Sequence, residues 1–187
     1  RHEPMVQLIT CGVGDEWAGL EDRHGDHLRN GLNGYIWYYV FRAECFTLDE
    51  MPAIHLDARV FSDPGKRDLG RHTGRHHEII ARMVAHKKFR SWMRNAHRTF
   101  AKVFINWDGG PILPAVVFCR SGKHRGVAAS EILKGVLSRV EGWKFAPTIH
   151  MSIDIEREGC RCDNCRPDRQ ICESIEKSIA LAVSALD

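Results

Sequence analysis

The chain has 187 residues, of which 43% are hydrophobic, and its net charge is +3 with histidine neutral. This length suits one domain with a full core, and no run of eighteen or more apolar residues occurs, which argues against a membrane-spanning helix. Seven cysteines, three of them in "CRCDNC", favour free thiols or a metal over a disulfide framework. We therefore expect an intracellular, reducing compartment.

The first half of the sequence predicts strands separated by loops. Residues 5–14, "MVQLITCGVG", are typical of a short buried strand that runs into a glycine turn. Residues 15–34 are polar and glycine-rich, and the aromatic run at 35–46 fits a strand or a buried helix. Residues 53–61 alternate as a strand does, and residues 62–74 form a long loop with a Pro-Gly turn.

The second half changes from strand-like to helical periodicity. From His76 the apolar spacing predicts two helices, or one helix broken near 86–88. A buried strand at 115–120, a glycine loop and a helix follow, then a strand at 147–156 and a C-terminal helix. This alternation predicts a single α/β domain over 5–187, with a mostly parallel sheet and helices on both faces.

The stretch "FCRSGKHRG", residues 118–126, joins a buried strand to a helix through a glycine loop. Such a loop turns backbone N–H groups inward, and the next helix adds its positive N-terminal dipole. Arg125 can close the site with a bidentate contact, while Lys123 and His124 add positive charge. The pattern predicts a phosphate-binding cradle; the alternative is an ordinary strand–turn–helix with a basic surface.

The spacing Cys-x5-Arg also occurs in cysteine-dependent phosphatases. In that alternative Cys119 is the nucleophile, Arg125 clamps the oxyanion and Asp108 is the general acid. A buried Cys that closes the strand is the competing interpretation. We expect a non-enzymatic binding role and keep catalysis as an alternative.

Three motifs occur in a fixed order: "LDARVFSDP" (56–64), "HTG" (72–74) and "FCRSGKHRGVAASEIL" (118–133). In this order they resemble the C-terminal domain of the RapZ family, the bacterial RNase adapter proteins, and the resemblance covers about 5–14 and 55–140. It implies an anion site for a phosphorylated amino sugar and a basic surface that contacts a small RNA. The ligand-binding residues that it implies are Asp57, Arg59, His72, Thr73, Gly74, Cys119, Ser121, Gly122, His124 and Arg125. The stretch 15–50 is an insertion relative to the family.

The cysteine-rich loop at 157–172 contains Cys160, Cys162, Cys165 and Cys172. Four thiolates at this spacing can surround a tetrahedral zinc ion, with His150 as an alternative fourth ligand. Four protein ligands leave no open position, so the predicted zinc is structural. The alternative is a set of free thiols in a polar loop.

A basic segment along the two predicted central helices suggests a polyanion partner. Its members are Arg82, Arg90, Arg94, Arg98 and Lys102. They predict an RNA-binding stripe, or simply a solvated helix face. The sequence thus leads to a sensor or adaptor that binds a phosphosugar or nucleotide. A phosphatase and a structural subunit of a larger assembly or oligomer are the alternatives.

Overall fold

The structure is a computed structural model, and it describes residues 3–13, 53–155, 160, 162–166 and 172–187. The insertion at 15–50, including the aromatic run, lies outside the described residues. So does most of the predicted loop at 157–172.

A four-stranded, all-parallel sheet lies at the centre of the described chain, in the order β2-β3-β1-β4. The strands are β1 (Met5–Gly12), β2 (Ile54–Asp57), β3 (Ile112–Cys119) and β4 (Ile149–His150). The two central strands pair along their full length, from Met5 opposite Ile112 to Gly12 opposite Cys119. The predicted α/β fold with a parallel sheet is confirmed.

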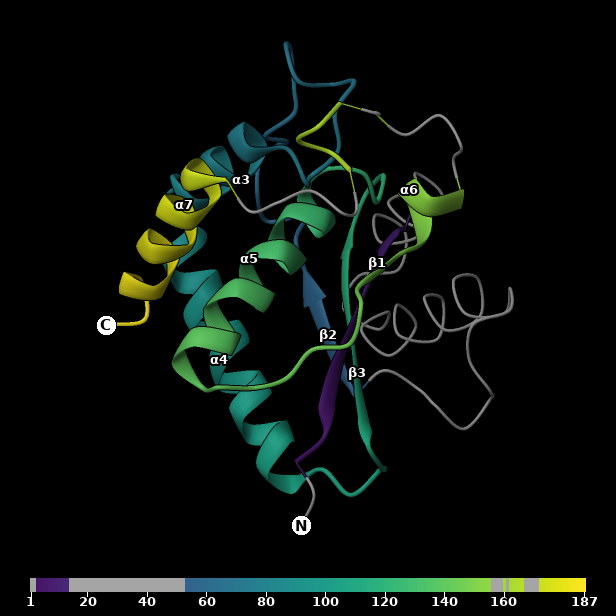
Figure 1. Ribbon diagram of the computed structural model, residues 1–187, viewed down its shortest axis with the longest axis vertical. Coiled ribbons are helices and arrows are strands. Elements are labelled where there is room, and N and C mark those ends of the chain that lie inside the picture. Colours follow the sequence, from purple (N-terminus) through teal and green to yellow (C-terminus); the bar gives the residue numbers. More distant parts are fainter. Residues whose placement is uncertain (1–2, 14–52, 156–159, 161, 167–171) are drawn as a thin grey trace, which may run out of the picture.

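Helices alternate with these strands along the chain. They are α3 (His77–Val84), α4 (Phe89–Asn106), α5 (Arg125–Val140), α6 (Met151–Ile155) and α7 (Glu173–Ser184). The break between α3 and α4 falls at 85–88, as predicted. Figure 1 shows α3, α4, α5 and α7 together on one side of the sheet, with the short α6 on the other side of the view. Helices on the second face remain a prediction.

The core forms where these helices cover alternate residues of the strands. Leu8 on β1 and Val117 on β3 point to the same face and are fully buried. Ile132 on α5 and Phe100 on α4 belong to the same apolar cluster. Burial of each such side chain contributes roughly 1.5–3 kcal/mol to the stability of the described fold.

The predicted strand at 147–156 is wrong in its extent. Only Ile149–His150 is extended, and the chain then turns into α6. β4 pairs with Ile9 and Thr10 near the end of β1, so a longer strand would soon have run past its partner. The buried His150 Nδ1 instead lies 2.8 Å from Thr10 Oγ1, which fixes the end of the strand.

The two central strands, β1 and β3, end side by side at the carboxyl end of the sheet. β2 lies beyond β3 and β4 lies beyond β1, so the chain leaves β1 and β3 in opposite directions. In open parallel sheets, ligands bind outside the carboxyl ends of two such strands. The loop after β3 lies at this position.

No helix among residues 3–13, 53–155 and 172–187 is both long enough and apolar enough to cross a membrane.

We predict that Phe100→Ala lowers the free energy of unfolding by about 3–5 kcal/mol, because it removes a fully buried ring from the core. Ile105→Ala on the same helix is the matched control. Its side chain is 71% exposed, so we expect a change within about 0.5 kcal/mol. Urea denaturation measures both, and equal losses would contradict the assigned core.

Candidate functional site

The glycine loop from Cys119 to Arg125 packs directly against the end of β1. Gly122 has φ +70°, a conformation that favours glycine. A Cβ at Gly122 would collide with Ser152 Oγ and with the backbone N of Gly12. A Cβ at Gly12 would lie 2.6 Å from the carbonyl carbon of Ser121. Two glycines are therefore needed for this close approach of backbones.

Several N–H groups of the loop have no internal partner. The N–H of Gly122 donates to Cys119 Sγ at 3.2 Å. Within the described part of the chain, no hydrogen bond uses the backbone N–H of residues 123–125. These groups open the first turn of α5, where a helix always leaves its N–H groups unpaired. The loop thus has the free donors that an anion site requires.

The charged side chains of the loop turn toward neighbouring backbone. Arg125 Nη1 donates to the carbonyl oxygen of Phe61 at 3.1 Å, and Lys123 Nζ donates to that of Gly70 at 3.1 Å. Each ring nitrogen of His124 faces an oxygen: Asp63 Oδ1 at 3.0 Å and the His72 carbonyl at 2.9 Å. Arg125 therefore has a structural contact with the backbone, and its clamping role stays a prediction. The sequence did not single out Asp63 or Ser152, which lie against this loop.

Asp57, the last residue of β2, and Arg59 lie at the carboxyl end of the sheet. Their side chains form an ion pair with each other. Arg59 Nη2 lies 2.8 Å from Asp57 Oδ2, and Arg59 Nε lies 3.0 Å from Asp57 Oδ1. The guanidinium also lies over the ring of Phe118, 5.4 Å from its centroid. Much of the charge of Arg59 is thus matched within the protein.

The geometry gives no support to the predicted phosphatase chemistry. Cys119 is fully buried, so its sulfur is not exposed to a substrate. Asp108 precedes the amino end of β3, whereas Cys119 is the last residue of that strand. Eight residues at about 3.3 Å each separate them, so Asp108 cannot act as the acid for Cys119.

The predicted "HTG" motif lies between the glycine loop and the cysteines. The N–H of Gly74 donates to the carbonyl of Lys123 at 2.9 Å, and Gly74 has no room for a Cβ beside His124 and Ala128. Thr73 is buried, and its N–H donates to Cys165 Sγ at 3.4 Å. The motif therefore borders the glycine loop and also meets a second site.

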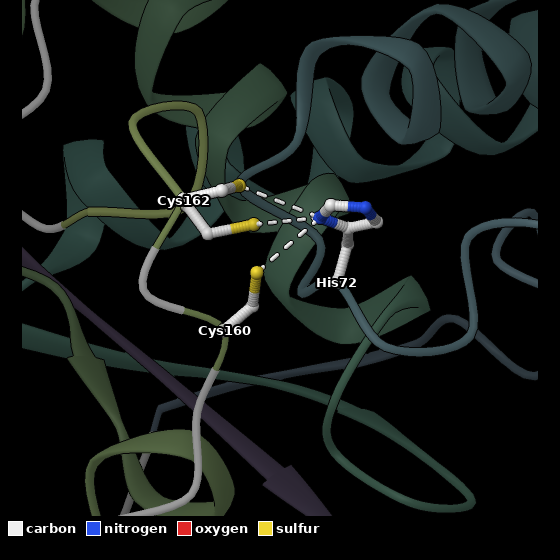
Figure 2. Close-up of side chains that lie close together, drawn as sticks. His72, Cys160 and Cys162 are labelled. Carbon is white, nitrogen blue, oxygen red and sulfur yellow. Dashed lines mark hydrogen bonds between the residues drawn. The ribbon is translucent and has the colours of Figure 1, made fainter.

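That second site is a cluster of one histidine and three cysteines that can hold a metal ion: His72, Cys160, Cys162 and Cys165. Figure 2 shows the sulfur atoms converging on one ring nitrogen of His72. His72 Nδ1 lies 3.4 Å from the sulfurs of Cys160 and Cys162 and 3.7 Å from that of Cys165. Metal–ligand bonds of about 2.0–2.3 Å in a tetrahedron separate ligand atoms by about 3.5–3.8 Å, which matches these distances.

The thiols of this metal cluster influence one another. Burial raises the pKa of the Cys165 thiol to about 11. Burial also acts to raise the pKa of Cys162, but hydrogen bonds with Cys160 and Cys165 bring that pKa below its ordinary value. Three sulfurs so close together can all be thiolates only when a cation lies among them.

The fourth ligand differs from the prediction. Cys172 is the residue before α7 and is not a member of the metal cluster. The alternative His150 is occupied elsewhere, between Thr10 and Glu131 Oε1 at 3.5 Å. The fourth member of the metal cluster is His72, which lies far from the cysteines in sequence. The sequence signal was that the three cysteines of the motif need a fourth ligand. Any of the eleven histidines of the chain could provide it.

The predicted basic stripe is divided in the structure. Arg82 lies on α3 and forms two hydrogen bonds with Asp68, at 2.9 and 2.8 Å. On α4, Arg94 Nε donates to the carbonyl of Ala185, and Arg98 Nη2 donates to Asn95 Oδ1. Arg90 and Lys102 are exposed. An RNA surface therefore stays a prediction, with fewer available cations than the sequence suggested.

Comparison of the chain with family models, with curated proteins and with solved structures finds no match. The resemblance to the RapZ C-terminal domain thus remains a prediction from the motifs.

We predict that the purified chain contains one zinc ion, and that Cys162→Ser removes it because the substitution replaces a thiolate of the metal cluster. His72→Ala should weaken retention, whereas Cys172→Ser, the matched control, should retain the ion. Elemental analysis and the visible spectrum of the cobalt-substituted protein measure this. Zinc lost in Cys172→Ser and kept in His72→Ala would contradict the assigned ligands.

Proposed function

We propose that the chain binds a phosphorylated or otherwise anionic small molecule, such as a phosphosugar or nucleotide, at the loop 119–125. It acts there as a non-enzymatic sensor or adaptor. The observation that carries the proposal is the free N–H groups of residues 123–125 at the start of α5. They follow β3 at the carboxyl end of the sheet, where the chain leaves β1 and β3 in opposite directions.

Charge and rigidity support this proposal. Lys123 and Arg125 lie next to the free N–H groups, so an oxyanion there gains charge-assisted hydrogen bonds. Gly12 and Gly122 allow the loop to pack at backbone contact distance from β1. The loop is therefore largely ordered before the ligand binds, which lowers the entropy cost of binding. The burial of Cys119 fits a binding loop better than a nucleophile.

We infer that the metal cluster holds zinc in a structural role. Three thiolates and one imidazole are soft ligands that select zinc among the common divalent ions. The three distances from the sulfurs to His72 Nδ1 fit tetrahedral ligation, and four protein ligands leave no position for substrate. The ion would fix residues 160–166 against the segment that borders the glycine loop.

We predict that inorganic phosphate and a hexose phosphate raise the thermal midpoint of the chain, because a ligand of the folded state stabilises it by mass action. Lys123→Ala should weaken binding by roughly ten- to a hundredfold, the equivalent of one charge-assisted hydrogen bond. Lys134→Ala, on the outer part of α5, is the matched control and should bind as the parent does. Isothermal titration calorimetry measures the affinities.

A backbone variant tests the same site independently of charge. Gly122→Ala should abolish phosphate binding, since the new methyl group collides with α6 and with β1. Gly142→Ala controls for strain, because Gly142 also has φ +71° but has open space around its Cβ position. No thermal shift of the parent with any phosphate ester would refute the proposal. Turnover of an aryl phosphate that disappears in Cys119→Ser would establish the phosphatase instead.

A further inference from the structure

The segment from Gly70 to Gly74 connects the metal cluster to the glycine loop. On one side, His72 Nδ1 belongs to the metal cluster, and the Thr73 N–H donates to Cys165 Sγ at 3.4 Å. On the other side, three hydrogen bonds join the segment to Lys123 and His124, at 3.1, 2.9 and 2.9 Å. A short stretch of chain is thus held at both sites at once.

The connection leaves no room for the loop and the segment to move separately. A Cβ at Gly74 would lie 2.4 Å from the N of Ala128 and would collide with the carbonyl oxygen of His124. The ring of His124 is buried and lies so close to Gly65 that a Cβ there would be 2.6 Å from it. Displacement of the segment therefore displaces His124 and the first turn of α5, which together provide the free N–H groups.

The sulfur atoms of the metal cluster link residues 160–165 to a single segment. They form hydrogen bonds with His72 Nδ1 and with the N–H of Thr73. Metal–ligand bonds are strong compared with these sulfur contacts, and their free energy adds directly to the ordering of the chain. A metal ion bound there would therefore hold the segment in place on its outer side.

We propose that metal occupancy of the metal cluster controls the affinity of the loop 119–125 for its anion. This inference rests on the proposed function and adds its regulation. With the ion bound, the segment is fixed and the loop is already ordered for the ligand. Without it, the ligand must order the segment, and that cost lowers the affinity. Linkage requires the reverse as well: the anion tightens metal binding by the same factor.

The test compares the zinc-loaded full chain with the same chain after chelation, using inorganic phosphate as the probe. We expect the phosphate affinity to fall on the order of tenfold when zinc is removed, and to recover when zinc is returned, within the range usual for coupled sites. Cys162→Ser should behave as the stripped protein does. Cys172→Ser should behave as the loaded protein does, because this cysteine lies outside the metal cluster.

A second measurement does not require the metal-free chain to fold. Phosphate should slow the transfer of zinc from the loaded protein to a chromophoric chelator. In Lys123→Ala, which binds phosphate weakly, the same phosphate concentration should have little effect on the rate of zinc transfer. This variant therefore controls for direct binding of phosphate to zinc.

The outcomes separate the two proposals. If the zinc-loaded chain binds no phosphate, the proposed function itself fails. If loaded and stripped chains bind phosphate equally, or phosphate leaves zinc transfer unchanged in the parent, the anion site stands and its control by the metal is overturned.

Discussion

The parallel pairing of β1 with β3 is the contact on which the rest of the described structure depends. It aligns eight residues on each strand, so both strands end at the same level. Their last residues, Gly12 and Cys119, then place the glycine loop against the end of β1. β2 and β4 add to the outer edges of this pair, and α5 packs over it. A shift of register by one residue would move every side chain of a strand to the opposite face of the sheet and separate Gly12 from Gly122.

Much of this arrangement could be predicted, because local patterns determine it. The apolar runs around Leu8 and Val117 and the helical spacing of Ile132 are strong signals of a strand–loop–helix fold. The glycine loop was recognised for the same reason: Gly122 lies between a buried strand and an amphipathic helix. Cys160, Cys162 and Cys165 were found because metal ligands that are close in sequence leave a visible spacing.

The errors arose where the outcome depends on contacts across the fold. His72 belongs to a loop with no periodicity, and only the folded chain brings it to the cysteines. The extent of β4 depends on where β1 ends, which the sequence around Ile149 does not contain. Asp108 lies near Cys119 in sequence, but a strand between them carries them to opposite ends of the sheet. Short sequence separation is a poor guide to proximity whenever an extended strand intervenes.

The distance along the chain between His72 and Cys160 gives the metal cluster a further consequence. They are 88 residues apart, so an ion bound to both closes a loop that contains α3, α4, β3, α5, β4 and α6. Like a disulfide, such a cross-link acts on the unfolded chain: for a loop of this size it removes conformational entropy on the order of 4–5 kcal/mol. Three of the ligands are close together in sequence, and the fourth joins them only across the folded domain. An ion bound by all four would therefore stabilise most of the described domain.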